Sequence, residues 1–252
     1  MARIYEAPGW QEYEIVYSDP HKPLESLDRE IEIIDAALAE LVDAGILPHA
    51  DYDKEKLLAH RAGVEDNFEI PWTAITHRMQ RLIYAINAIA QPDTMIAVGI
   101  FCGNTFISNA GAAVGPGACY RASRLVGLEI RPEEAERAAR NVSSIDPEGC
   151  AQILAQDGIP FLRDIDGTVD LLYLDADGTG GRGKSIYLDM FEAARHALRP
   201  GSLLLAHNSV NSADQMGDYL NTVRNPDIFS ASVNMFVDGE GLEVSRYTGN
   251  EG

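Results

Sequence analysis

The chain has 252 residues, of which 46% are hydrophobic and 23% are charged. This composition excludes a disordered or fibrous protein, and the length suits a single α/β core of roughly 250 residues. Acidic residues outnumber basic ones by 39 to 20, which gives a formal net charge of −19. An anionic surface repels phosphate backbones and anionic lipids, so neither a nucleic acid nor a membrane is an expected partner.

No segment of the sequence predicts a membrane span or a secretory signal. The most apolar stretch, residues 82–102, is interrupted by Asn87, Gln91 and Asp93. It falls short of the roughly 18 uninterrupted apolar residues that cross a bilayer. The first 14 residues lack the basic-then-apolar order of a secretory signal. We therefore expect a cytoplasmic protein.

The N-terminal 70 residues differ in pattern from the rest of the chain. Apolar residues at alternating spacings of three and four fill residues 24–41, and Gly45 and Pro48 follow them. This predicts a long amphipathic helix that packs on its own domain or forms a dimer contact, and a homodimer is the expected assembly. The charged stretch 51–66 predicts a short helix or a lid. We expect residues 1–70 to form a helical extension that covers the substrate or contacts a second copy.

From residue 71 onward, predicted strands and helices alternate. The predicted strands are the apolar runs 95–98, 125–128, 152–155, 169–174 and 202–206. Near-continuous apolar strands that alternate with helices are typical of a doubly wound parallel sheet. We therefore predict an α/β fold for residues 71–252. In such sheets ligands bind beyond the carboxyl ends of the strands, so the residues that follow each strand are the candidate site.

The residues after the first three strands suit a nucleoside cofactor. Gly99 and Gly103 follow the first strand and let the backbone approach a ligand, and Glu129 follows the second, where a carboxylate accepts ribose hydroxyls. A full dinucleotide glycine motif is absent, because Phe101 stands two residues after Gly99. The combination, with Asp157 after the third strand, favours S-adenosylmethionine (SAM). The predicted cofactor contacts are Gly99, Ile100, Phe101, Gly103, Asn104, Thr105, Glu129, Ile130, Gln156, Asp157, Gly158 and Asp175.

Five segments carry a resemblance to a known family. They are residues 98–103, 126–130, 173–177, 198–208 and 237–246. From about Pro71 to Tyr247 the chain resembles the cation-dependent O-methyltransferases, which include the catechol and caffeoyl-coenzyme A enzymes. The resemblance implies a Rossmann-like methyltransferase sheet, mostly parallel with a C-terminal antiparallel hairpin. It also implies transfer of the methyl group of SAM to a hydroxyl of a small-molecule acceptor.

The resemblance also implies a divalent cation. In that family an aspartate after the fourth strand and an Asp-Asn pair after the fifth hold Mg²⁺. Asp175 and Asn208 match these positions, whereas His207 stands in place of the second aspartate. Because Mg²⁺ prefers oxygen ligands, His207 either selects a softer metal or marks a site without metal. The predicted metal ligands are Asp175, His207 and Asn208, and Ala97, where the family usually has glutamate, weakens one expected cofactor contact.

The family's catalytic lysine is displaced in this chain. Six extra residues separate Asp177 from Lys184, which the resemblance identifies as the general base. A lysine desolvated near a metal has a lowered pKa and can accept a proton. His207 is the alternative base, and Asp175 completes the predicted catalytic set. We interpret the inserted glycine-rich residues 178–183 as a mobile lid over the acceptor.

Two other function classes remain open from the sequence. Residues 178–185 fit the P-loop pattern G-x-x-x-x-G-K-[ST], follow a strand and precede a helix, as in a kinase or NTPase. Asp175 and Asp177 would crowd the phosphates with negative charge, however, and this interpretation gives Glu129 no role. The departures at Ala97 and His207 also allow a methyltransferase fold without catalytic activity.

Overall fold

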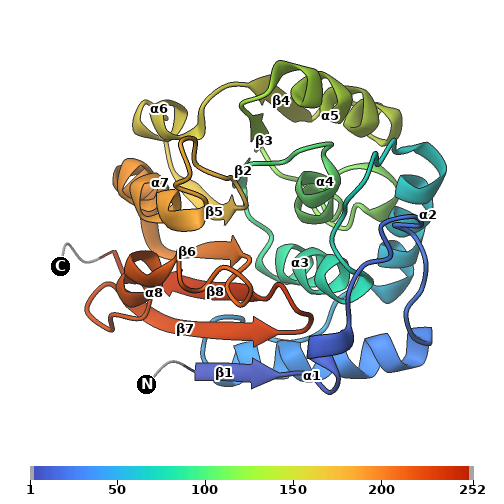
Figure 1. The fold of residues 1–252 in the computed structure, drawn as a ribbon, viewed down its shortest axis with the longest axis horizontal. Coiled ribbons are helices and arrows are strands. Elements are labelled where there is room, and N and C mark those ends of the chain that lie inside the picture. The colour runs from blue at the N-terminus through green and yellow to red at the C-terminus, as the bar shows by residue number, and fades with distance from the viewer. Residues whose placement is uncertain (1–2, 250–252) are drawn as a thin grey trace.

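The computed structural model describes residues 3–249, which form an eight-stranded sheet with helices on both faces (Figure 1). The strands follow the order β1-β7-β8-β6-β5-β2-β3-β4 across the sheet. Their bounds are β1 (Arg3–Glu6), β2 (Thr94–Val98), β3 (Arg124–Glu129), β4 (Ala151–Ala155), β5 (Val169–Leu174), β6 (Leu198–His207), β7 (Phe229–Phe236) and β8 (Leu242–Tyr247). The five strands predicted from the apolar runs are all present.

Eight α-helices and four short 3-10 helices connect these strands within the described residues. The α-helices are α1 (Leu27–Asp43), α2 (Lys54–Asn67), α3 (His77–Ala90), α4 (Asn104–Ala110), α5 (Pro132–Ile145), α6 (Gly158–Arg163), α7 (Tyr187–Ala194) and α8 (Gly217–Val223). The 3-10 helices are η1 (Trp10–Glu12), η2 (Gly115–Gly117), η3 (Lys184–Ile186) and η4 (Arg195–Ala197). None of the helices seen in residues 3–249 has both the length and the hydrophobicity to cross a bilayer.

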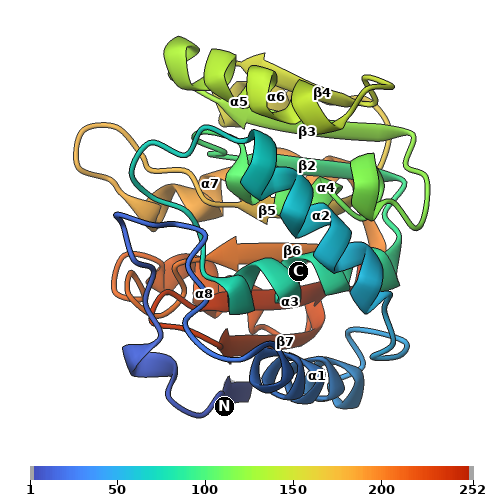
Figure 2. The ribbon, with the colours of Figure 1, turned by 90° about the vertical axis from the view of Figure 1, so that its right-hand side faces the viewer.

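The central strands are buried on both faces, as their apolar sequences require. In β2, Met95 and Ala97 belong to one hydrophobic core, and Ile96 and Val98 belong to the other. Helices α1, α3 and α4, in front of the sheet in Figure 2, contribute to the first core, and α6, α7 and α8 contribute to the second. The strands β2 to β6 run parallel to one another, whereas β8 pairs antiparallel with β6 and β7. This confirms the predicted mostly parallel sheet with a C-terminal antiparallel hairpin.

The N-terminal segment contributes a strand as well as helices. Strand β1 pairs in parallel with β7 at the edge of the sheet, where the sequence predicts only helices. The predicted amphipathic helix is α1, which begins after Ser26, whose side chain accepts a hydrogen bond from the backbone N–H of Arg29 at 3.3 Å. Ile34, Leu38 and Leu41 of its apolar stripe are fully buried within this chain, whereas Leu27 at the start of the helix is 41% exposed. Most of the stripe therefore packs on its own domain.

Because β2 to β6 are parallel, their carboxyl ends lie at one edge of the sheet. The last residues of these strands and the loops that follow them carry the residues predicted from the sequence, Gly99, Glu129, Asp157, Asp175 and His207. The antiparallel pairing of β6 with β8 places His207 opposite Leu242. The turn between β7 and β8 therefore reaches the same edge.

Candidate active site

The turn after β2 approaches the loop after β5 so closely that only glycine fits. Gly99 has φ +82°, and a Cβ atom at this position would lie 2.3 Å from the Cα atom of Ala176. Gly103, with φ +91°, precedes α4, and Phe101 also has a positive φ of +49°. The loop bends back on itself without side chains at its closest approach. This is the backbone arrangement that the glycine pattern predicts.

Glu129, at the end of β3, connects this turn to the next loop. Its carboxylate is 5% exposed and accepts a hydrogen bond from the backbone N–H of Phe101 at 2.9 Å. The other carboxylate oxygen accepts from the backbone N–H of Arg131 at 3.1 Å and from its guanidinium at 3.2 Å. Ile130, the next residue, is 52% exposed. A fixed carboxylate therefore lies beside an exposed apolar side chain, as a ribose and an adenine require.

The other predicted cofactor residues divide into buried supports and exposed groups. Ile100, Asn104 and Thr105 are buried, and the side-chain oxygen of Asn104 accepts from the backbone N–H of Ile75 at 3.4 Å. These three residues support the turn from behind. In the loop after β4, Gln156 and Asp157 are exposed, and Asp157 also accepts from the backbone N–H of Ile159 at the start of α6.

Gly158 closes the same loop against β2. A Cβ atom at Gly158 would lie 2.3 Å from Cγ1 of Val98. The backbone N–H of Gln156 donates to the carbonyl of Glu129 at 3.1 Å. The loops after β2, β3 and β4 are therefore joined into one surface.

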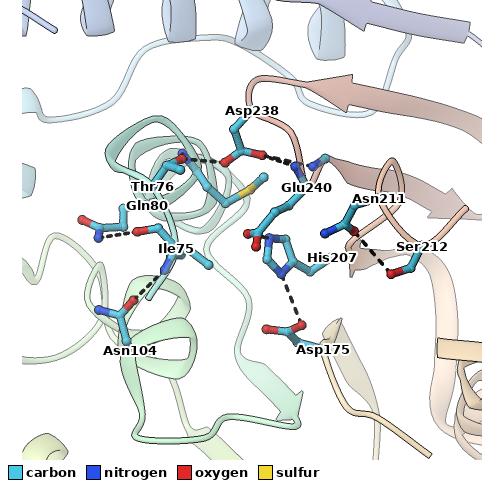
Figure 3. A network of polar contacts seen from close by, with 12 residues as sticks. Ile75, Thr76, Gln80, Asn104, Asp175, His207, Asn211, Ser212, Asp238 and Glu240 are labelled. Atoms are coloured by element: carbon cyan, nitrogen blue, oxygen red, sulfur yellow. Dashed lines mark hydrogen bonds and ion pairs between the residues drawn. The ribbon is translucent and has the colours of Figure 1, made fainter. Parts of the chain in front are cut away.

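A chain of charged side chains lies at the ends of β5 and β6 (Figure 3). Nδ1 of His207 lies 3.2 Å from Oδ1 of Asp175, and Nε2 of the same ring lies 3.1 Å from Oε2 of Glu240. Lys184 Nζ donates to the backbone carbonyl of Asp175 at 2.9 Å and to its Oδ1 at 3.1 Å. The structure thus brings together all three predicted catalytic residues. Glu240, from the turn between β7 and β8, also belongs to this group and is not among the site residues predicted from the sequence.

The turn that carries Glu240 is itself anchored by a buried carboxylate. Asp238 is fully buried and accepts the backbone N–H groups of Glu240 and Gly241, each at 3.1 Å. Its other oxygen accepts from the hydroxyl of Thr76 at 2.5 Å (Figure 3). Thr76 also accepts from the backbone N–H of Met79 at the start of α3. The start of α3 therefore fixes the position of Glu240.

The charged side chains at this edge of the sheet shift the pKa values of His207, Asp175 and Asp238. Burial alone would lower the pKa of His207, but the neighbouring Asp175 and Glu240 carboxylates raise it to about 10. Burial alone would raise the pKa of Asp175, but Lys184 and His207 hold it below its usual value. Burial and the nearby Glu240 raise the pKa of Asp238. His207 is accordingly a cation and Asp175 an anion at neutral pH.

The contacts of two of the predicted metal ligands, Asp175 and His207, compete with a divalent cation. Nδ1 of His207 lies 3.2 Å from Oδ1 of Asp175, and Nε2 of the same ring lies beside Glu240. Asn208, the third predicted ligand, follows His207 directly and has a positive φ of +64°. Lys184 already places a positive charge on Asp175, and a histidine protonated at both nitrogens has no lone pair for a metal. Among residues 3–249, no group of three or more histidine, cysteine, aspartate or glutamate side chains is arranged to hold a metal ion.

The P-loop interpretation of residues 178–185 finds no support in the structure. The loop closes on itself through a hydrogen bond from the backbone N–H of Gly178 to the carbonyl of Gly183 at 2.9 Å. Lys184 points to Asp175, and it opens only the three-residue helix η3. In a P-loop the backbone amides and the lysine converge on phosphates, whereas here the lysine is held by a carboxylate.

Comparisons with known proteins agree with this architecture. Residues 96–209 match the model of a family described as a methyltransferase domain. No curated protein matches the sequence of this chain. Among solved structures, an O-methyltransferase from Bacillus cereus in complex with SAH is similar at a TM-score of 0.55 and 15% identity, over 86% of this chain and 100% of that chain.

Two further structures show the same likeness. The O-methyltransferase TomG from Streptomyces achromogenes, involved in tomaymycin synthesis and in complex with SAM, has a TM-score of 0.54 and 17% identity, over 89% of this chain and 100% of that one. A methyltransferase from Geobacter sulfurreducens has a TM-score of 0.54 and 19% identity, over 84% and 96%. At this identity the likeness concerns the fold. The domain match over residues 96–209 agrees with the Rossmann-like methyltransferase sheet that the sequence predicts.

Proposed function

We propose that this chain is a SAM-dependent methyltransferase that acts on a hydroxyl oxygen of a small organic molecule. The observation that carries the proposal is the chain of Lys184, Asp175, His207 and Glu240 at the same sheet edge as Glu129. Hydroxyl methylation requires a group that receives the hydroxyl proton and charges that stabilise the oxygen as it loses that proton. Two of the similar structures are named O-methyltransferases, which supports the same acceptor chemistry.

The residues at the ends of β2 to β4 suit SAM. The Glu129 carboxylate accepts three hydrogen bonds, from the backbone N–H groups of Phe101 and Arg131 and from the Arg131 guanidinium. Since a carboxylate offers about four acceptor sites, one site is left for a ribose hydroxyl. The exposed Ile130 side chain suits one face of an adenine ring, and Asp157 suits its amino group. The Gly99 to Gly103 turn admits the amino-acid end of the cofactor. When bound, SAM supplies a methyl group on a sulfonium that is already activated for transfer.

The protein's part in the transfer is alignment and proton removal. A bond forms between the acceptor oxygen and the methyl carbon, the carbon–sulfur bond breaks, and the sulfur leaves as a neutral thioether. Lys184 donates to Asp175, and Nδ1 of His207 lies 3.2 Å from the same carboxylate. Asp175 and Glu240 raise the pKa of His207 to about 10, so neither predicted base is ready to accept a proton at neutral pH. Glu240, whose side chain is 32% exposed, is the carboxylate in this chain that we propose receives the hydroxyl proton.

An exposed aromatic surface supports an organic acceptor. Trp72 is 58% exposed, and its ring centroid lies 5.1 Å from that of Phe101 in the cofactor turn. Large exposed apolar side chains beside a polar site are typical of small-molecule binding surfaces. We propose that the acceptor lies between this pair and Glu240.

The cofactor part of the proposal is tested by calorimetry with SAM. We expect SAM to bind the wild-type protein and Glu129→Ala to weaken binding about 10- to 100-fold, because hydrogen bonds to a charged group contribute roughly 1.5–3 kcal/mol. Glu133→Ala, an exposed acid in the first turn of α5, is the matched control and should bind SAM like the wild type. Binding of ATP without binding of SAM would overturn the assignment.

The acceptor part is tested by transfer of a radiolabelled methyl group from SAM to a panel of hydroxylated and aminated small molecules. We expect label on hydroxyl acceptors. Transfer to amines alone would contradict the proposal, and SAM binding without transfer to either class would favour the non-catalytic alternative. The cytoplasmic location and the homodimer stay predictions. Ile34, Leu38 and Leu41 of α1 are buried within the chain and Leu27 is 41% exposed, and sedimentation analysis would detect a dimer.

A further inference from the structure

Two cationic side chains contact one carboxylate at the place where the related family would hold its metal. Lys184 Nζ lies 3.1 Å from Oδ1 of Asp175, and His207 Nδ1 lies 3.2 Å from the same oxygen. Lys184 is 6% exposed and His207 is 3% exposed. Buried charges in proteins are paired or coordinate metals, and here the pairing is already complete.

The His207 ring lies between two carboxylates. Its Nδ1 is within hydrogen-bond distance of Asp175 at 3.2 Å, and its Nε2 lies 3.1 Å from Glu240 as an ion pair without hydrogen-bond geometry. A carboxylate at each nitrogen favours the ring with two N–H groups and one positive charge, which has no lone pair for a metal.

The glycine-rich insertion, residues 178–183, positions Lys184 beside Asp175. Its backbone N–H donates to the side-chain oxygen of Gln215 at 2.9 Å. Gly183, with φ +49°, precedes it, and a Cβ atom there would lie 1.9 Å from the same Gln215 oxygen. The insertion closes through the Gly178–Gly183 pairing and thereby turns Lys184 toward the end of β5. The segment that matches the P-loop pattern in the sequence thus positions Lys184 at the end of β5.

We propose that Lys184 and His207 together take the place of the divalent cation, so that the acceptor site works without a metal. This inference rests on the proposed hydroxyl methylation. Two protein cations face two carboxylates, Asp175 and Glu240, which matches the charge balance of a divalent ion on two aspartates. Fixed cations near the acceptor oxygen stabilise the negative charge that develops there during transfer.

The replacement of the divalent cation by Lys184 and His207 also determines which class of acceptor fits the site. A metal ion in the related family chelates two vicinal oxygens, whereas an ammonium group donates single hydrogen bonds. Two of the three N–H donors of Lys184 go to Asp175, and the nearest oxygen of Asp177 is 3.7 Å away, beyond hydrogen-bond distance. One donor remains for one oxygen of the acceptor. The acceptor therefore needs a single hydroxyl, and a vicinal pair gives no advantage.

Metal binding to the wild-type protein tests the proposal directly. The electron paramagnetic resonance signal of free Mn²⁺ is measured with and without protein, in the presence of SAH. We expect no loss of the free signal from an ion bound at Asp175. Mn²⁺ binding that disappears in Asp175→Asn would overturn the proposal. SAM binding is measured separately by calorimetry, so failure of the cofactor assignment and failure of this inference are distinguishable.

A double variant tests whether the two cations are what excludes the ion. Lys184→Met combined with His207→Asp removes both positive charges and restores the Asp, Asp, Asn set of the related family. We expect this variant, with its fold checked by circular dichroism, to gain Mn²⁺ binding. Arg182→Met is the matched control, because Arg182 lies in the same insertion but pairs with Asp189, and it should not gain binding. Failure of a folded double variant to bind Mn²⁺ would contradict the proposal.

Catalysis gives an independent readout. We expect methyl transfer by the wild type to survive exhaustive chelation, and Lys184→Met to lower kcat about 100-fold without rescue by added Mg²⁺. Acceptors with one hydroxyl should be methylated as fast as their vicinal dihydroxyl counterparts. A strict requirement for vicinal hydroxyls, or full loss of transfer on chelation, would overturn the inference.

Discussion

Glu240 lies 3.1 Å from His207 although the two residues come from different turns of the sheet edge. Their contact depends on the antiparallel register of β6 and β8, which places His207 opposite Leu242 and the preceding turn beyond the end of β6. Asp238 and Thr76 then fix that turn against the start of α3. The C-terminal hairpin and the N-terminal half of the chain thus jointly position one imidazole ring.

This relationship predicts how His207 titrates. Glu240→Gln removes an opposite charge next to the ring, and such a charge shifts a neighbouring pKa by about 1–3 units. We expect the pKa of His207 to fall from about 10 by at least one unit, as measured by NMR of the ring protons. Asp214→Asn, an exposed acid in the segment after β6, should leave it unchanged. An unchanged titration in Glu240→Gln would mean that Asp175 alone charges the ring.

The same ring makes stability depend on pH. The pKa of His207 is about 10 in the folded state and close to 6.5 when unfolded, so between these values the folded state binds more protons. Its contribution to the free energy of unfolding is therefore full below pH 6.5 and declines as pH rises toward 10, by at most about 1.4 kcal/mol per pH unit.

Urea denaturation from pH 6 to 10 checks this dependence. The difference between wild type and His207→Gln isolates the contribution of the ring, and we expect it to shrink as pH rises. His49→Gln, at an exposed histidine, is the matched control substitution. A difference that grows with pH would contradict the predicted sign.

A buried ion cluster gives a prediction for the N-terminal segment. Glu30 on α1 accepts from Arg81 on α3 at 2.6 Å and from Arg61 on α2 at 2.9 Å, and Arg81 is fully buried. Glu30→Ala leaves Arg81 without its carboxylate partner, and we expect the free energy of unfolding to fall by about 3–5 kcal/mol. Glu32→Ala removes an exposed pair with Arg29 on the same helix and should cost less than about 1 kcal/mol. Equal losses in the two variants would show that burial of the cluster is unimportant.

Local patterns were sufficient to predict much of this fold. The apolar runs that become β2 to β6 are buried on both faces, so hydrophobicity alone identifies them. Strand β1 has only four residues, three of them exposed, and pairs with β7 more than 200 positions away. This segment forms a strand because it pairs with that distant partner, so no local sequence pattern predicts it.

The candidate site, like the fold, contains residues that local sequence patterns predict and one residue that they do not. Gly99, Glu129, Asp175 and His207 follow strands directly, so the parallel topology alone brings them together. Glu240 reaches His207 only through the register of a hairpin, and the charge state of His207 follows from that contact. The sequence therefore predicts metal ligands where the structure shows an ion chain. Knowledge that β8 pairs with β6 would have pointed to Glu240.

The close approach at Gly99 gives a final prediction, for the cofactor turn. Gly99→Ala introduces a Cβ atom 2.3 Å from the Cα of Ala176 at a position with φ +82°. A left-handed residue costs about 1–2 kcal/mol and overpacking about 1–3 kcal/mol, so we expect the free energy of unfolding to fall by about 2–5 kcal/mol. Gly45→Ala has a similar φ of +75° with no atom within 4 Å, and should show only the first cost. SAM binding, measured by calorimetry, should weaken in Gly99→Ala and persist in Gly45→Ala, because only the first variant separates the loops after β2 and β5. Equal losses of stability with SAM binding intact in both would refute the close approach as the reason for glycine at position 99.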